Sequence, residues 1–324
     1  MVSWRGDKVN YVYVFINIVV ILSLTLNIPE YVVHVIILTL WYAYLSTAWA
    51  IISGYAGQVS LGHSLFVAAG SYTIAMLYHH YGITPILGIP VAILVACLFV
   101  VIIGVPSFKL GVRGPYFTFS TLAAAQVLFY LLIAYSHITG GELGLSLKYT
   151  GNPLYLHFAD KRIYLLMIFL LWNLEIILIR KMIFRGRLGY YLVAIREDED
   201  AAAAVGINVF KYKMIALLLS GILTALGGAF YTIYFNYVAP PSVASLQLSF
   251  RIATTGLVGG ARSWMGPTMG SIVITPIMEY IRIRFGSRFV ALPLAIYGFL
   301  LLIIANTAPL GLSRLLFKGR DEIR

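Results

Sequence analysis

The feature that most constrains the fold is a succession of apolar runs, each long enough to cross a lipid bilayer. A helix needs roughly 20 mostly apolar residues to span the hydrocarbon core. Ten such runs can be placed along the 324 residues. We therefore expect an all-α, polytopic integral membrane protein whose single transmembrane domain covers residues 1–324. The expected spans are 11–28, 31–53, 64–80, 86–107, 115–138, 163–183, 214–238, 246–260, 268–284 and 289–306.

Composition agrees with this class and excludes several others. Hydrophobic residues make up 60% of the chain and charged residues only 11%, which is typical of membrane proteins. The single cysteine, Cys97, lies in an apolar run, so neither a disulfide framework nor a thiolate metal site is expected. The first run lacks a small-x-small cleavage site, so we interpret it as a span and not as a signal peptide. No phosphate-binding GxxxxGK[ST], HExxH or Ser-His-Asp pattern occurs, so we predict no catalytic residue, metal or cofactor, and no ATP hydrolysis by this chain.

The basic residues predict the orientation. If the N-terminus is inside, sixteen of the 23 Lys and Arg fall on inner segments, six on outer segments and Arg251 within a span. The positive-inside rule then places both termini and the loop 184–213 in the cytoplasm. We expect a multi-pass protein of the cell membrane, in contact with lipid. The net charge of +11 follows from this asymmetry and does not indicate nucleic-acid binding.

Two glycine-rich interruptions lie between the apolar runs. The first, Ser53 to Leu65, reads SGYAGQVSLGHSL and has no Lys, Arg, Asp or Glu. The second, Thr255 to Ser271, reads TGLVGGARSWMGPTMGS. Matched interruptions in two pseudo-repeated halves are a pointer to a translocation path, although tight turns that pack small residues would give the same pattern. The first segment is either re-entrant or a cytoplasmic turn. The residues expected on the path are Gly54, Gly57, Gln58, Ser60, Gly62, His63, Gly256, Gly259 and Gly260.

A charged, alanine-rich segment stands in the predicted cytoplasmic loop. Acidic residues 197–200 precede four alanines, and acids favour the N-terminus of a helix while alanine is the best helix former. Gly206 supplies a stop. We expect a short cytoplasmic helix that receives mechanical work from a separate motor protein. The residues expected at this contact are Glu199, Asp200, Ala201, Ala202 and Gly206.

Five ordered segments carry a family resemblance: SGYAGQVSLGHSLFVAAGSYT, RGPYFTFSTLAAAQVL, TGGELGL, AIREDEDAAAAVGINVFKYK and TGLVGGARSWMGPTMGS. They resemble the permease subunits of branched-chain amino-acid ABC importers. Asp200-Ala201-Ala202 followed by Gly206 is similar to the EAA–G coupling segment of importer permeases, with Asp in place of the usual Glu. The resemblance implies three kinds of partner: a homologous second permease, two cytosolic ATPase subunits and an external substrate-binding protein.

Three alternatives remain at this point. Permeases for urea or short amides share the same segments. A stand-alone secondary transporter or channel could also use broken helices, but it would need acidic residues at the midplane, where Glu175 is the main one. An integral-membrane enzyme lacks any convergent set of reactive groups.

Charged residues outside these segments have two interpretations each. Glu175 and Arg251 lie within spans, where we favour a structural pair of Glu175 with Arg251 or Arg180 over a substrate or gating contact. On the outer side, Arg284 and Arg288 are expected either to anchor in lipid headgroups or to dock the binding protein. We favour docking.

Overall fold

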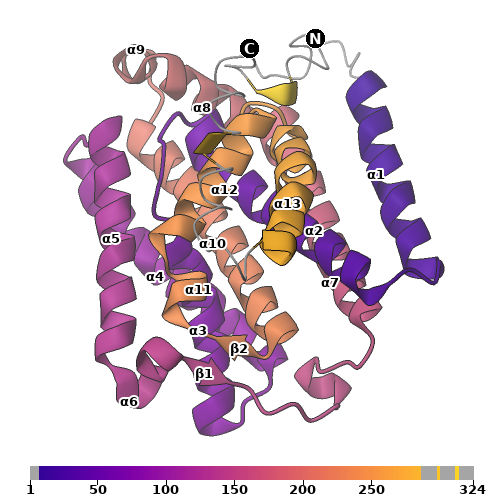
Figure 1. Cartoon of the computed structure of the whole chain (residues 1–324). Coiled ribbons are helices and arrows are strands. Elements are labelled where there is room, and N and C mark those ends of the chain that lie inside the picture. Colours follow the sequence, from indigo (N-terminus) through magenta and orange to yellow (C-terminus); the bar gives the residue numbers. More distant parts are fainter. Residues whose placement is uncertain (1–6, 286–297, 300–310, 314–324) are drawn as a thin grey trace. The chain divides into compact units, whose positions relative to one another are not determined.

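The computed structural model describes residues 7–285, 298–299 and 311–313. Nearly all of its regular structure is helical (Figure 1). The chain divides into two compact units. Unit 1 comprises Met1–Thr47, Asp160–Arg185 and Thr254–Arg324, and unit 2 comprises Ala48–Ala159 and Gly186–Ala253. The all-α class is therefore confirmed for the described residues, whereas the units do not correspond to two sequential halves.

Unit 2 is built around four long helices that lie side by side (Figure 1). Shorter elements cover the two ends of these helices. The long helices are α3 (His63–Tyr81), α4 (Pro85–Lys109), α5 (Pro115–Ala134) and α10 (Val209–Phe235). The shorter helices are η1 (Ile51–Tyr55), α6 (Ser136–Thr139), η2 (Gly141–Leu143), η3 (Pro153–Tyr155), α8 (Arg187–Glu197), α9 (Glu199–Ala204) and α11 (Pro240–Val243).

Helices α3 and α10 approach closely because both carry glycine at the contact. A Cβ atom added at Gly70 would collide with the carbonyl oxygen of Ala225, and one added at Gly228 would collide with that of Val67. The Ser71 hydroxyl donates to the Gly228 carbonyl at 2.8 Å. Small residues that let backbones meet, and polar side chains that bond between helices, are what hold helices together where lipid removes the hydrophobic driving force.

The two ends of unit 2 gather different loops. At one end, strand β1 (Leu145–Ser146) pairs antiparallel with β2 (Tyr237–Val238), and the Tyr78 hydroxyl donates to the Lys148 carbonyl at 2.7 Å. Helices α8 and α9 lie at the opposite end (Figure 1). The loops predicted to be outside thus meet one another, and those predicted to be inside meet one another, as an alternating topology requires.

Unit 1 contains α1 (Asp7–Thr25), most of α2 (Glu30–Ala50), α7 (Lys161–Ile179), η4 (Arg180–Phe184), the end of α12 (Leu246–Gly259) and α13 (Gly266–Phe285). Polar contacts join these helices along their length. Lys161 pairs with Glu30 at 2.8 Å. The Trp172 indole N–H donates to the Thr268 hydroxyl at 3.1 Å, and the Ser271 hydroxyl donates to the Thr39 carbonyl at 2.6 Å.

Five helical stretches in the described part are long and apolar enough to cross a membrane. They are Glu30–Tyr55, Pro85–Lys109, Pro115–Ala134, Lys161–Phe184 and Val209–Phe235. Helix α12 has only 14 residues, fewer than the roughly 20 that a crossing needs. The expected tenth span, 289–306, lies outside the described residues except for 298–299. The number ten therefore stays a prediction.

The contact between α3 and α10 yields a stability prediction. Gly70→Ala should destabilise the protein by about 1–3 kcal/mol, because overpacking must push two backbones apart. Gly88→Ala is the matched control, since the one close contact of its new methyl would be with the Ile74 Cδ1 atom, at 2.8 Å, which is the end of a flexible side chain, while Leu77 Cδ1 at 3.6 Å is at an ordinary distance. Thermal unfolding in detergent should show a lower midpoint for Gly70→Ala alone. Equal midpoints for the two variants would contradict the close backbone approach.

Candidate functional site

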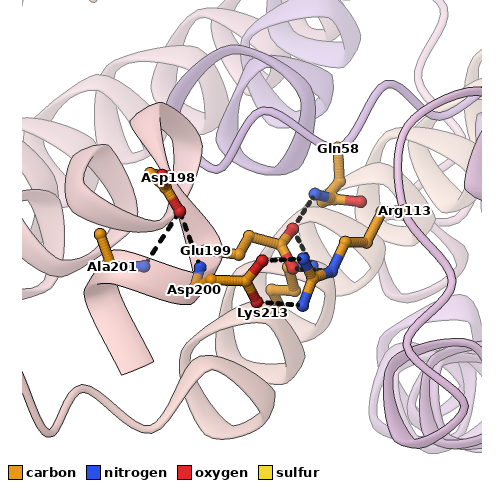
Figure 2. Close-up of polar contacts among 7 residues, drawn as sticks. All are labelled: Gln58, Arg113, Asp198, Glu199, Asp200, Ala201 and Lys213. Atoms are coloured by element: carbon orange, nitrogen blue, oxygen red, sulfur yellow. Dashed lines mark hydrogen bonds and ion pairs between the residues drawn. The ribbon is translucent and has the colours of Figure 1, made fainter. Parts of the chain in front are cut away.

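The predicted cytoplasmic helix forms α9, and the chain sets both of its ends. The Asp198 side chain caps the N-terminus by accepting the backbone N–H groups of Asp200 and Ala201, each at 2.9 Å (Figure 2). At the C-terminus Gly206 has a φ of +88°, a conformation that favours glycine. The Gly206 N–H reaches the Ala203 carbonyl at 3.0 Å. A sharply terminated turn of helix results.

The alanines of α9 divide into one inward and several outward residues. Ala202 is 3% exposed and therefore packs inside unit 2. Ala201, Ala203 and Ala204 are exposed, and Val205 just beyond the helix is 77% exposed. The open surface of α9 consequently consists of the Asp200 carboxylate and the small side chains of Ala201, Ala203 and Ala204.

Glu199 anchors α9 to three other elements of unit 2 (Figure 2). Its Oε1 atom accepts a hydrogen bond from Gln58 Nε2 at 2.8 Å and forms an ion pair with Lys213 Nζ. Its Oε2 atom lies 2.9 Å from Arg113 Nε. Gln58 belongs to the first glycine segment, Arg113 to the loop between α4 and α5, and Lys213 to the first turn of α10. One carboxylate thus joins four parts of the chain.

The ion pair with Lys213 is largely withdrawn from solvent. The Lys213 side chain is 3% exposed and the Glu199 side chain 11%. The ammonium also lies 5.5 Å from the centre of the Phe108 ring, a favourable distance for a cation. Removing one partner of such a pair leaves an uncompensated buried charge, which costs about 3–5 kcal/mol. The two residues therefore depend on each other.

Asp200 makes a second, exposed attachment. The Arg113 guanidinium donates from Nη1 and Nη2 to the two Asp200 carboxylate oxygens, at 3.0 and 2.8 Å. These hydrogen bonds hold the pKa of Asp200 below its ordinary value and raise that of Arg113. A lowered carboxyl pKa gives stability that is complete above the ordinary value near pH 4 and is lost as the pH falls through the folded-state value. This attachment is therefore intact at neutral pH.

The first glycine segment, 53–63, is folded into unit 2. Except for Gly57, Val59 and Leu61, its residues are buried. Its polar groups bond to neighbouring backbone and side chains: the Trp49 indole donates to the Ser60 carbonyl at 2.7 Å, and the Ser60 N–H donates to the Ser53 hydroxyl at 3.1 Å. Irregular backbone at membrane depth is stable only when it is buried in protein or lines a cavity. The burial observed here meets that requirement.

His63 is held by serines on both sides of its ring. The Ser220 hydroxyl donates to the Ala48 carbonyl at 2.7 Å, so it accepts from His63 Nε2 at 2.8 Å. The other ring nitrogen, Nδ1, then accepts from the Ser60 hydroxyl at 3.2 Å. This assignment gives a neutral imidazole that carries its proton on Nε2. His63 is 0% exposed, so its ring is packed within unit 2, and its place on a translocation path stays a prediction.

Glycines Gly57 and Gly62 permit two close contacts. Gly57 has a φ of +73°, and a Cβ atom there would lie 2.7 Å from Arg196 Cγ. A Cβ atom at Gly62 would collide with the Thr121 carbonyl oxygen. Arg196 donates from Nη1 to the Gly54 carbonyl at 3.3 Å. Helix α8, like α9, is thus attached to the glycine segment.

The second glycine segment belongs to unit 1, whereas the first belongs to unit 2. Gly256, Gly259 and Gly260 are all buried. A Cβ atom at Gly259 would collide with the Gly266 carbonyl oxygen, so this glycine lets the start of α13 approach α12. Its role in a translocation path stays a prediction.

The remaining predictions from the sequence concern charged residues within the spans and on the outer side. Glu175 is buried in unit 1, and neither carboxylate oxygen has a hydrogen-bond partner among the described residues. Of the two expected partners, Arg180 therefore makes no hydrogen bond to Glu175; it donates to Asn10 Oδ1 at 3.2 Å and lies over the Trp264 ring. The other expected pair, with Arg251, stays a prediction. Arg284 is exposed, while Arg288 lies outside the described residues.

Two members of the Glu199 cluster, Arg113 and Lys213, are not predicted from the sequence. The sequence indicates only that both are basic residues of the predicted inner segments. One sequence feature does indicate Lys213: it stands at the start of an apolar run. A lysine side chain that is buried there requires an acidic partner. No group of three or more His, Cys, Asp or Glu in the described part of the chain is placed to hold a metal ion.

The comparisons with known proteins identify the class. The chain belongs to the family described as branched-chain amino acid transport system / permease component, whose model matches residues 31–305. The resemblance noted from the five segments is thereby confirmed, and the protein is a membrane-embedded transport component. No solved structure gives a significant match.

Two curated relatives extend over most of the chain. A stretch of 272 residues, 77% of the chain, is 26% identical to the high-affinity branched-chain amino acid transport system permease protein LivM of Escherichia coli (strain K12). This match spans 63% of the length of that relative. A stretch of 257 residues is 25% identical to the probable branched-chain amino acid transport permease protein LivH of Methanocaldococcus jannaschii, covering 76% of this chain and 80% of the relative.

The Glu199 cluster predicts unequal effects of two similar substitutions. Glu199→Gln should destabilise the protein by about 3–5 kcal/mol, because it leaves Lys213 buried without a countercharge. Asp200→Asn, the matched control, removes an exposed pair and should leave stability nearly unchanged. Unfolding midpoints in detergent at pH 7 measure the difference. A larger loss for Asp200→Asn than for Glu199→Gln would show that the buried pair does not anchor α9.

Gly57 and Gly206 both have a positive φ, so the effects of an alanine substitution at these two positions can be compared. Gly206→Ala should cost about 1 kcal/mol, from the left-handed conformation alone, since no atom lies within 4 Å of its Cβ position. Gly57→Ala should cost more, because the methyl also displaces the Arg196 side chain. The two free energies of unfolding decide this point. A cost at Gly57 no greater than at Gly206 would contradict the close packing of α8 on the glycine segment.

Proposed function

We propose that this chain is the membrane-spanning permease subunit of a binding-protein-dependent ABC importer that moves branched-chain amino acids into the cell. The observation that carries the proposal is α9: a short, exposed, small-residue helix fixed by Glu199 to α10, to the α4–α5 loop and to the glycine segment. A protein outside the membrane can displace such a helix, and the displacement is transmitted to the helices within the membrane. The names of the relatives supply the substrate class.

The proposed complex contains a homologous second permease, two cytosolic ATPase subunits and an external binding protein. ATP hydrolysis belongs to the ATPase subunits, so this chain is not itself an enzyme. The bound binding protein delivers the substrate, and closure of the ATPase pair displaces α9. In the same proposal Glu199, Asp200, Ala201 and Gly206 shape the coupling contact, and Ala202 supports it from within.

The topology of the proposal has ten spans in two pseudo-repeated halves, with both termini cytoplasmic in the cell membrane. Loop 184–213 is the cytoplasmic coupling loop. The segregation of predicted inner and outer loops at opposite ends of unit 2 supports the alternation of the spans, and the excess of Lys and Arg on the inner segments supports this orientation. The translocation path runs beside the glycine segments 54–63 and 256–260. Arg284 and Arg288 remain the proposed docking residues for the binding protein.

The exposed face of α9 gives the test of coupling. Ala203→Trp should lower uptake of radiolabelled leucine at least about tenfold, with normal protein levels, because a bulky side chain cannot seat where a small one fits. Ala203→Ser is the matched control and should transport normally. Uptake by membrane vesicles with the binding protein and ATP is the measurement. Normal uptake by Ala203→Trp would exclude α9 as the motor contact.

The same assay separates the substrate classes. Wild-type vesicles should accumulate leucine, isoleucine or valine, and competition by urea or acetamide should be absent. Uptake of urea without uptake of any branched-chain amino acid would replace the proposed substrate and leave the coupling mechanism unchanged.

A further inference from the structure

Gln58 occupies the junction between the glycine segment 53–63 and α9. Its side chain is 4% exposed. The amide nitrogen donates to Glu199 Oε1 at 2.8 Å (Figure 2). An ionised carboxylate can only accept, so the atom that faces Glu199 must be the nitrogen. The amide oxygen, Oε1, is consequently turned away, and it is buried with no hydrogen-bond partner in the part of the chain that the structure describes.

Stability alone does not account for a glutamine in this place. A buried carbonyl without a partner is unfavourable. Glu199 does not require Gln58 for compensation, because its two oxygens already face Lys213 and Arg113. An apolar side chain of the same length would lose one hydrogen bond and also remove one buried unsatisfied atom. The amide therefore contributes something other than net stability.

The position of Gln58 in the network indicates what this contribution is. Its backbone N–H donates to the Ile52 carbonyl at 3.0 Å, and the next residue, Val59, accepts from the Thr118 hydroxyl at 2.8 Å. The glycine segment is thus held by η1 and α5 at its backbone and by α9 through one side chain. A hydrogen bond to a charged group is strong and directional, so it moves the segment when its acceptor moves.

We propose that Gln58 is a positioning residue that transmits displacement of α9 to the glycine segment through its hydrogen bond to Glu199. The proposal rests on the function given above, in which a motor protein moves α9. It assigns Gln58 to coupling, in place of the position on the translocation path expected from the sequence. Glu199 is the matching element on the α9 side, and its contacts with Lys213 and Arg113 fix the position of its carboxylate.

The test follows the glycine segment directly. A reporter, Val59→Cys, is placed in a Cys97→Ala background; Val59 is 39% exposed, and Cys97 is the chain's one cysteine. Inside-out vesicles from the source organism carry the full chain with its own partners. The rate of labelling by a water-soluble maleimide is measured without nucleotide and with ATP plus vanadate, which holds ABC motors closed.

Nucleotide should change the labelling rate about tenfold in the reporter protein, the population shift that one charge-assisted hydrogen bond can drive. Adding Gln58→Met should reduce the change to less than about twofold, because the side chain keeps its length and loses the donor. Gln58→Glu, which repels Glu199, should behave in the same way. Tyr237→Phe is the control; it removes a hydrogen bond to the Leu143 carbonyl at the opposite end of unit 2, leaves the Gln58 bond in place and should keep the full response.

Four outcomes would overturn the proposal. They are a full response in Gln58→Met, a lost response in Tyr237→Phe, no response in the reporter protein, and absence of Gln58→Met protein from the vesicles, which would make the amide a stability residue. Failure of the proposed function is seen separately, as a reporter protein that responds to nucleotide while right-side-out vesicles, loaded with ATP and supplied with the binding protein, accumulate no branched-chain amino acid.

Discussion

The rest of the candidate site depends on the buried ion pair between Lys213 and Glu199. A lysine in the first turn of α10 has its side chain withdrawn from water, and only a carboxylate at the same place makes that tolerable. The carboxylate comes from the first residue of α9. Because a buried charge cannot leave its partner without a large cost, α9 stays attached to α10. A helix of six residues, too short to be stable alone, thereby gains a fixed position.

Because the helix backbones of unit 2 are closely packed, a displacement of α9 can be transmitted to the other helices. Helix α10 crosses α3 at glycines, with no flexible side chains between the backbones. The glycine segment that precedes α3 is tied by hydrogen bonds to Trp49 and Ser53. Elements packed in this way have few intermediate positions, and small displacements are passed on as shifts between discrete arrangements. A motor that moves α9 therefore acts on a connected body.

Local patterns made several elements predictable from the sequence. The apolar runs predicted α4 and α10, and the acidic cap, alanine run and Gly206 predicted α9, because each depends on residues close together in the chain. The partners of Glu199 could not be found in this way. Arg113 comes from the loop between α4 and α5 and Lys213 from α10, and they reach the carboxylate only after these helices pack.

The burial of individual residues could not be predicted from local sequence patterns either. The sequence left open whether segment 54–63 is re-entrant or a turn, and it did not distinguish Ala202 from its exposed neighbours. Both depend on what surrounds the backbone. Glu175 is a further example: a charge within a span suggested a pair with Arg251 or Arg180, yet Arg180 bonds to Asn10.

A double-mutant cycle on Glu199 and Lys213 tests the central claim most directly. The free energies of unfolding would be measured in detergent for the wild type, Glu199→Gln, Lys213→Met and the double variant. The account predicts that each single change is strongly destabilising and that the double variant recovers much of the loss, with an interaction energy of about 2 kcal/mol or more. Additive losses, with an interaction energy near zero, would contradict the claim that this pair anchors the coupling helix.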